Sequence, residues 1–250
     1  MSDRPVVLAT VAARMDSSRL PSKALRRVHD RPLVAAVMDR TSRCRRVDSV
    51  VLATTTRAVD DPLADWAHRS GWDCHRGEVD DVAARLLTAA DEAGADVVVR
   101  VNGDCPFTDA TLMDQGIDRL IESDAELVTN IPGRKFPYGI SVEVFRAALL
   151  RRWHPRMNER DREHVTAAFY RDLDCETPTI DYRVLSPPSN RSSFPASSRA
   201  RLVVDTPEDY SAACRLAETV DRRCGKPGGW IDVPHDVFAQ LQLQPAARSA

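Results

Sequence analysis

Three cationic side chains follow the first predicted strand within ten positions of one another. They are Arg14, Arg19 and Lys23, with the hydroxyls of Ser17 and Ser18 between them. Guanidinium forks, an ammonium group and a loop offering hydroxyl and N–H donors together suit the oxygens of a polyphosphate. The segment has neither the Gly-x-x-x-x-Gly-Lys pattern of a P-loop nor the Gly-x-Gly of a dinucleotide-binding turn. The sequence therefore predicts a phosphate-binding loop of another kind, with an ordinary charged surface loop as the alternative.

Carboxylates follow two further predicted strands. Asp104 lies in the turn Asn102-Gly-Asp-Cys-Pro106, directly after an apolar run, and Asp205 follows the apolar run 201–204. Carboxylates in such turns can hold Mg²⁺ against phosphate oxygens. Asn-Gly-Asp is also common turn chemistry, and Asp205 or Thr206 could instead cap a helix that starts there and carries Asp209 in its first turn. Cations at one strand end and carboxylates at two others match what a nucleoside triphosphate with Mg²⁺ requires.

Alternating strands and helices must position these side chains. Continuous apolar runs indicate strands at 6–12, 49–54, 72–75, 96–101 and 126–130, and helical periodicity indicates helices at 32–43, 60–70, 79–93 and 109–122. This order predicts an α/β fold with a doubly wound parallel sheet. Ligands bind at the carboxyl ends of such strands, which directs attention to the loops after Val11, Thr54, Val101 and Asn130.

The second half of the chain is less regular. Residues 133–145 predict a loop or hairpin that returns as a strand, 161–171 a helix, 179–185 and 201–204 strands, and 206–223 a helix. The Ser- and Pro-rich stretch 186–198 is expected to be turn-rich and mobile, and the tail 242–250 to be frayed. We expect one domain over residues 1–241, in which about 131–200 form an inserted region for dimerisation and acceptor binding.

Composition limits the class of protein. The 250 residues carry 35 basic and 37 acidic side chains, a net charge of −2, so no strong field favours nucleic acid. No apolar run approaches the ~20 residues needed to cross a bilayer, and the first residues do not resemble a signal peptide. The six cysteines form no Cys-x-x-Cys pair and are expected to be free thiols. We expect a soluble, cytoplasmic protein without a nucleic-acid or membrane partner.

Five motifs, in chain order, resemble those of a known family. They are Arg14-Met-x-Ser-x-Arg-Leu-Pro-x-Lys23, Gly103-Asp-Cys-Pro106, Phe136-Pro-x-Gly-x-x-Val-Glu-Val-Phe145, Arg162-Glu-His-Val-Thr166 and Val204-Asp-Thr-Pro-Glu-Asp209. In these motifs the sequence resembles the spore-coat-polysaccharide type of cytidylyltransferase. More distantly, it is similar to the CMP-sugar synthetases that activate 3-deoxy-manno-octulosonate and sialic acid. The resemblance runs over about residues 6–216.

The resemblance implies a fold and an activity. The fold would be the Rossmann-like nucleotide-diphospho-sugar transferase fold, with a mostly parallel central sheet, helices on both faces and a protruding β-hairpin. The activity would be CTP-dependent transfer of CMP to a small anionic acceptor, with Mg²⁺ as cofactor, release of pyrophosphate and a homodimeric enzyme. An acid sugar, a phosphorylated acid and a phosphonate are all acceptors that fit this expectation.

The resemblance also implies roles for individual residues. The triphosphate would be bound by Arg14, Arg19 and Lys23, and Mg²⁺ by Asp104 and Asp205. The rest of the nucleotide site would comprise Ala12, Ala13, Ser17, Ser18, Thr54, Thr55, Arg85 and Asn102. The acceptor site would comprise Arg134, Lys135, Tyr138, Ser141, Glu143, Arg162 and His164, with His164 as a general base or an anion ligand, or else as a histidine that fills a helix–sheet contact.

The sequence departs from the family pattern in two places. Asp16 and Ser22 stand where the family has glycine, so the first loop is expected to be stiffer and Asp16 to point away from the phosphates. Tyr138 and Ser141 stand where the family has acidic residues, which favours a more anionic or less hydroxylated acceptor.

Two other functions stay open from the sequence. One is a sugar-1-phosphate nucleotidyltransferase that uses another nucleoside triphosphate, although such enzymes carry a glycine-rich first loop and this chain has no glycine before Gly71. The other is a catalytically silent nucleotide-binding subunit, against which the intact Lys23, Asp104 and Asp205 weigh.

Overall fold

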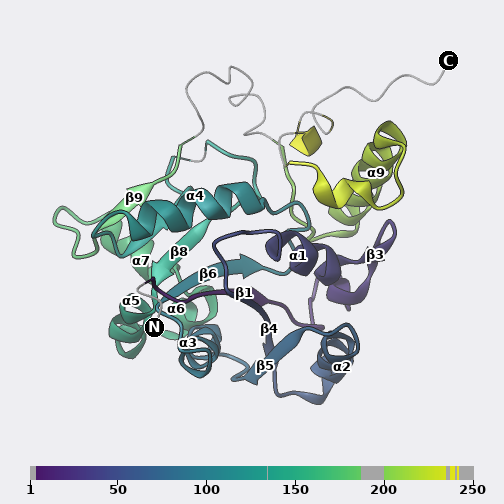
Figure 1. Cartoon of the computed structure of the whole chain (residues 1–250). Helices are drawn as coiled ribbons and strands as arrows, with labels where there is room; N and C mark the ends of the chain where they lie inside the picture. Colours follow the sequence, from purple (N-terminus) through teal and green to yellow (C-terminus); the bar gives the residue numbers. More distant parts are fainter. Residues whose placement is uncertain (1–3, 134, 187–199, 235–236, 240, 242–250) are drawn as a thin grey trace.

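The protein is built on a seven-stranded central sheet (Figure 1). The computed structural model describes residues 4–133, 135–186, 200–234, 237–239 and 241. In that part of the chain the strand order is β5-β4-β1-β6-β8-β7-β9. The strands are β1 (Val7–Ala12), β4 (Ser49–Thr55), β5 (Asp73–Gly77), β6 (Val97–Asn102), β7 (Leu127–Thr129), β8 (Glu143–Arg146) and β9 (Tyr182–Val184).

Parallel pairing dominates the half of the sheet that carries the predicted phosphate loop. Strands β5, β4, β1 and β6 are parallel neighbours, and β1 is paired on both sides. Such strands are buried on both faces, which is why they appear in the sequence as valine-rich runs rather than as alternating patterns. Strand β8 runs antiparallel to both β6 and β7, and β9 is parallel to β7. The predicted mostly parallel α/β sheet is confirmed.

Helices cover both faces of the sheet, in two separate apolar clusters. One face is covered by α1 (Leu33–Thr41), α2 (Asp61–Arg69), α4 (Ala110–Ile121) and α9 (Pro207–Cys224). The other face is covered by α3 (Val82–Glu92), α5 (Ala147–Trp153) and α7 (Ala167–Leu173), with α6 (Glu159–His164) against α3. Short 3₁₀ turns connect these elements: η1 (Lys23–Leu25), η2 (Ala58–Asp60), η3 (His154–Arg156) and η4 (Gly229–Asp232).

Two predicted elements were wrong. The helix expected at 161–171 is two helices, α6 and α7, because the backbone at Val165 turns through φ 49° and ψ −70°. The strand expected at 201–204 does not form, because Arg201 makes only an isolated bridge to Tyr138. The stretch 187–199 and the tail 242–250 lie outside the described residues.

Some elements carried no clear sequence signal. The segment after Gly133 does return as a strand, but that strand is β8, inside the sheet between β6 and β7. The hairpin that stands apart from the sheet is β2 (Arg27–Val28) with β3 (Arg31–Pro32), in the first quarter of the chain. Helix α5 was also not predicted from the sequence.

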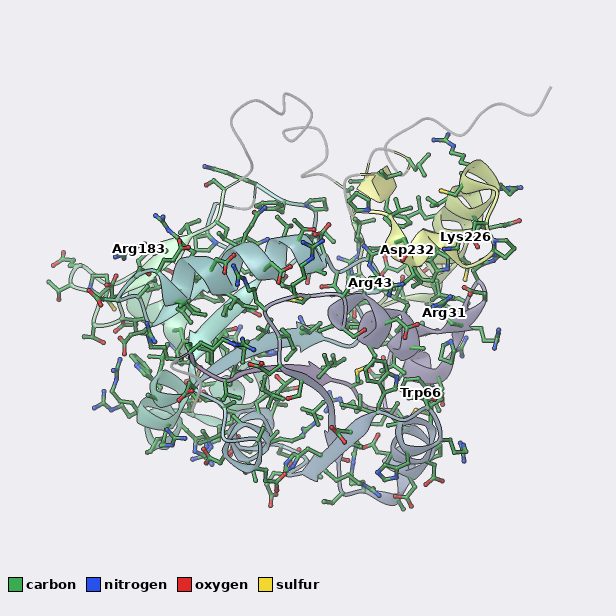
Figure 2. All side chains as sticks on the ribbon, in the orientation of Figure 1. Arg31, Arg43, Trp66, Arg183, Lys226 and Asp232 are labelled. Atoms are coloured by element: carbon green, nitrogen blue, oxygen red, sulfur yellow. The ribbon has the colours of Figure 1, made fainter. Side chains whose placement is uncertain are left out.

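The C-terminal segment closes over α1. The Arg40 side chain of α1 is almost fully buried and donates to the carbonyl oxygens of Thr108, Trp230, Ile231 and Val233 at 2.7–3.1 Å. On the surface, Asp232 forms ion pairs with Arg43 at 2.7 Å and with Lys226 at 3.3 Å (Figure 2). In the described part of the chain, every helix is too short or too polar to cross a bilayer.

Candidate active site

A cavity of about 340 Å³ opens at the carboxyl ends of β1 and β6. This is the edge at which parallel α/β sheets bind ligands. Twelve of the side chains or backbones singled out from the sequence line it: Ala12, Ala13, Arg14, Ser17, Ser18, Arg19, Lys23, Arg85, Asn102, Asp104, His164 and Asp205. Residues from five distant stretches of the chain therefore meet at one place.

Lys23 lies between the two predicted metal ligands. Its Nζ donates to Asp104 Oδ2 at 2.8 Å, to Asp205 Oδ1 at 3.1 Å and to the carbonyl oxygen of Val204 at 3.1 Å. Burial acts to lower the pKa of Lys23, but the neighbouring Asp104 and Asp205 outweigh it, so the pKa is raised above 10.5. Lys23 is therefore held as a cation, in contact with both carboxylates.

The position before Asp104, Gly103, has no room for a side chain. A Cβ on Gly103 would come within 2.7 Å of the Ala13 Cβ and 2.8 Å of the Ala12 carbonyl oxygen. The Gly103 N–H donates to that same carbonyl at 2.9 Å. The end of β6 thus packs directly against the end of β1, which brings Asp104 to the first loop.

Asp205 is not the cap of the helix that follows it. Thr206 is the N-cap of α9, and its side chain forms a capping box with Asp209. Asp209 also accepts the backbone N–H of Asp205 at 3.1 Å. Because Thr206 and Asp209 satisfy the helix start, the Asp205 carboxylate is left to face the cavity, where it also pairs with Arg19 at 3.2 Å and Arg201 at 3.1 Å.

The two carboxylates fit a divalent cation. Asp104 and Asp205 both contact the one ammonium of Lys23, so the structure already places a cation between them. No group of three or more His, Cys, Asp or Glu side chains suited to a metal occurs among the described residues. Mg²⁺ needs no such cage, since it is commonly held by one or two carboxylates together with substrate phosphates.

The first loop is held from beneath by a buried aspartate. Asp60 is fully buried, accepts the Met15 N–H at 2.7 Å and also accepts from the Thr55 hydroxyl. Asp16 pairs with Arg57 at 2.5 Å and with Arg14 at 3.4 Å, and it is absent from the described cavity wall. Ser22 has φ 57° and ψ 23°, in the left-handed region, which gives a physical reason for glycine at this position.

Four guanidinium groups of the described residues line the cavity, and three of them, Arg14, Arg19 and Arg85, were predicted from the sequence. Arg14 and Arg19 are exposed on the first loop, and Arg14 reaches Glu163 of α6 at 3.5 Å. Arg85 is buried on α3 and donates to the carbonyl oxygens of Glu78 and Val79. Burial lowers the pKa of Arg85, and the nearby Arg14 adds to that effect. An anion bound in the cavity would offset the repulsion between the Arg85 and Arg14 guanidinium groups.

Several predicted residues do not line the cavity. Thr54 and Thr55 are fully buried at the end of β4, and the Thr55 hydroxyl donates to Asp60. Glu143 is also buried, paired with Arg100. Ser141 is partly buried in the loop before β8 and is likewise absent from the described lining.

The remaining predicted acceptor residues are held by other partners. Tyr138 lies against the Arg201 guanidinium, 4.8 Å from the ring centroid, and Lys135 Nζ lies 3.3 Å from Ser186 Oγ. Arg162 pairs with Asp81 at 3.2 Å and lines a neighbouring cavity rather than this one. Arg134 lies outside the described residues.

Two charged side chains of the cavity wall were not predicted from the sequence. Arg100 is enclosed in a valine-rich strand, and Glu163 lies in a motif from which only its neighbours were selected. Alternation along β6 could have identified Arg100, because it shares a face with Asn102.

Comparison with known proteins shows the family of the chain. A family model described as Cytidylyltransferase matches residues 8–225. The chain is a member of the cytidylyltransferase family, and hence a nucleotidyltransferase enzyme.

Three curated proteins illustrate the relationship. The chain is 28% identical to an uncharacterised protein of Methanocaldococcus jannaschii over 218 residues, 86% of this chain and 84% of the relative. It is 29% identical to the spore coat polysaccharide biosynthesis protein SpsF of Bacillus subtilis over 231 residues, 87% of this chain and 88% of the relative. It is 32% identical to the 3-deoxy-manno-octulosonate cytidylyltransferase of Geobacter sulfurreducens over 130 residues, about half of each chain.

Solved structures share the fold. A cytidylyltransferase from Leptospira borgpetersenii superposes with a TM-score of 0.77 at 24% identity, covering 97% of this chain and 98% of the other. A CMP:2-keto-3-deoxy-manno-octonic acid synthetase complexed with CTP gives 0.65 at 16% identity, covering 86% and 99%. A Mycobacterium tuberculosis protein in complex with manganese gives 0.53 at 18% identity, covering 84% and 98%.

Proposed function

We propose that the protein transfers CMP from CTP to an oxygen of a small anionic acceptor and releases pyrophosphate. The observation that carries the proposal is the contact of Lys23 with both Asp104 and Asp205, inside a cavity at the carboxyl ends of β1 and β6. The names of the relatives support an acceptor of the acid-sugar kind, since one is a 3-deoxy-manno-octulosonate cytidylyltransferase. The expected homodimer and the cytoplasmic location stay predictions.

The reaction is a displacement at the α-phosphorus of CTP. The acceptor oxygen forms a bond to that phosphorus, the bond to the bridging oxygen of the β-phosphate breaks, and pyrophosphate leaves with the electron pair. Such a transfer depends on positioning and charge neutralisation more than on a protein nucleophile. Lys23, Arg14 and Arg19 bind the triphosphate oxygens and neutralise the charge that develops on the leaving group.

Asp104 and Asp205 are the residues that would hold Mg²⁺. When bound, the ion supplies Lewis-acid charge neutralisation at the phosphate oxygens and lowers the pKa of a coordinated hydroxyl. The manganese bound to the Mycobacterium tuberculosis structural relative supports a divalent cation in this fold.

We assign His164 the role of general base. It lines the same cavity as Asp104, at the C-terminal end of α6. An acceptor hydroxyl must lose its proton during attack, and His164 would accept it as general base. A phosphate or phosphonate acceptor is already ionised and needs no base.

The test is pyrophosphate release with CTP, ATP, GTP or UTP, Mg²⁺ and a panel of acid sugars, phosphorylated acids and phosphonates. We expect release with CTP and at least one anionic acceptor. Release with another triphosphate and a sugar 1-phosphate would identify a different nucleotidyltransferase. CTP binding without release for every acceptor would identify a silent nucleotide-binding subunit.

A further inference from the structure

Arg100 is a largely buried charged side chain on a strand that is otherwise valine-rich. Strand β6 alternates so that Val97, Val99 and Val101 join one apolar cluster, whereas Arg100 and Asn102 lie on the opposite side. Both of these polar residues line the active-site cavity, and the Arg100 side chain is only 13% exposed. A buried guanidinium is expensive to desolvate, so its presence in the middle of the sheet calls for a role.

A buried carboxylate holds Arg100 in place. Arg100 Nη1 donates to Glu143 Oε2 at 2.5 Å, and Glu143 Oε1 accepts from the Tyr170 hydroxyl at 2.7 Å. The same hydroxyl lies 3.0 Å from Thr129 Oγ1. Burial acts to raise the pKa of Glu143, but Arg100, Thr166 and Tyr170 outweigh it and lower the pKa, so the carboxylate stays ionised. A chain of hydrogen bonds through Glu143 of β8, Tyr170 of α7 and Thr129 of β7 thus fixes one end of the guanidinium.

The contact with Glu143 uses only part of the guanidinium. An arginine has five N–H donors, and among the described residues Glu143 is the hydrogen-bond partner that the structure gives to Arg100. Arg100 Nε is buried without a partner in that part of the chain. A donor that is buried without a partner costs free energy. Arg100 lines the cavity, so a ligand that accepts hydrogen bonds there would be favoured.

We propose that Arg100 binds the oxyanion of the acceptor, a carboxylate or phosphonate, and so determines the substrate class; this inference rests on the proposed CMP transfer. Arg14, Arg19 and Lys23 come from the first loop, whereas Arg100 comes from β6 and lines the cavity together with Asn102 and His164. The planar guanidinium fork matches a carboxylate or phosphonate through two parallel hydrogen bonds. The expected preference for an anionic acceptor therefore rests on Arg100, rather than on Tyr138 and Ser141.

The test measures binding by calorimetry, with and without a non-hydrolysable CTP analogue and Mg²⁺. The probes are 3-deoxy-manno-octulosonate, N-acetylneuraminate and 2-hydroxyethylphosphonate, each compared with a neutral ester: the methyl ester of each sugar acid and the dimethyl ester of the phosphonate. The variants are Arg100→Lys, which keeps the charge but loses the fork, and R100M/E143Q, which removes both charges and leaves no buried ion alone. Arg152→Lys is the matched control, because Arg152 pairs with Glu126 through two hydrogen bonds outside the cavity.

We expect the wild type and Arg152→Lys to bind at least one oxyanion and to discriminate against its ester. Both Arg100 variants should lose roughly 10- to 100-fold in affinity for that oxyanion, the range of hydrogen bonds to charged groups, with unchanged affinity for the CTP analogue. Equal affinity for ester and acid, no binding of any oxyanion, or loss of CTP binding in place of acceptor binding would each overturn the assignment. Oxyanion binding through Arg100 without any pyrophosphate release would reject the proposed function and leave this assignment standing.

Discussion

At the scale of single residues, Lys23 is the side chain on which the cavity depends most directly, since it contacts both carboxylates. We expect Lys23→Met to lower kcat/KM for CMP transfer by ~10²–10³-fold, because it removes a charge-assisted contact to the leaving group. The measurement is steady-state pyrophosphate release, with thermal melting to confirm folding. Lys226→Met is the control, since Lys226 pairs with Asp232 at the surface. Activity of Lys23→Met near that of the wild type would exclude the assigned role.

Ser22 allows a second test at this scale, because it holds a left-handed conformation that favours glycine. We expect Ser22→Gly to raise the free energy of unfolding by ~0.5–1 kcal/mol, as relief of strain slightly exceeds the added chain entropy. A β-branched side chain tolerates this region poorly, so Ser22→Val should lower the same quantity by ~1–2 kcal/mol. Urea unfolding of the three proteins measures both effects. The reverse order of stabilities would show that the strain lies elsewhere.

At the scale of elements, the break between α6 and α7 shapes the acceptor side of the cavity. Val165 is fully buried and has the positive φ and negative ψ of a strained γ-turn. Strain of this kind persists only where the surroundings hold it. Asp161 supplies that hold, since it completes the capping box of α6 with Asn158 and accepts two hydrogen bonds at 2.5 Å from Arg171 of α7. The turn delivers His164 to the cavity.

Asp161→Asn tests this arrangement through stability and pH. Arg171 holds the pKa of Asp161 below its usual 3.8. The ionised carboxylate therefore stabilises the fold fully above pH 3.8, and the contribution is lost as the pH falls through the lowered value. We expect Asp161→Asn to cost about 1–2 kcal/mol at pH 7, as a cap and a partly exposed ion pair together, and the difference from the wild type to shrink in stronger acid. Urea unfolding of both proteins at pH 7 and in stronger acid measures the difference in their free energies of unfolding. A difference that grew in acid would contradict this account.

At the scale of the whole molecule, the sheet was predictable because its buried parallel strands are continuous valine-rich runs, as in β1, β4 and β6. The elements that failed depend on partners far away in the chain. The run 201–204 is as apolar as a strand, yet it meets a loop at Tyr138 instead of a strand edge. Nothing in the residue types around Val165 indicates a chain reversal in the middle of a helical pattern.

The residues of the cavity also divide into those that the sequence identified and those that it did not. Lys23, Asp104 and Asp205 were identified because they follow predicted strands and lie in motifs that resemble those of the family. Arg100 was missed because it lies within a valine-rich strand; alternation with Asn102 indicates its face, but only the structure shows that Glu143 is its partner. Thr54 and Thr55 are fully buried and are absent from the described lining, and their place in the nucleotide site stays a prediction.

Arg40 joins parts of the molecule that the sequence separates by nearly two hundred positions. Its guanidinium reaches carbonyl oxygens before α4 and in the segment around η4, so one side chain ties α1 to the C-terminal region. Arg40→Met should lower the free energy of unfolding by ~2–5 kcal/mol, because several buried carbonyls lose their donor together. Arg43→Met is the control and should change stability by less than ~1 kcal/mol, since its pair with Asp232 is exposed.

The same variant separates fold from function. The Arg40 contacts lie outside the described wall of the active-site cavity. We therefore expect folded Arg40→Met to bind a non-hydrolysable CTP analogue with the wild-type Kd at a temperature well below its lowered Tm. Calorimetric titration combined with thermal melting measures both quantities on one sample. A weakened Kd in fully folded protein would mean that the C-terminal segment holds the nucleotide site in shape, because α1 begins directly after the loop and hairpin that follow Lys23.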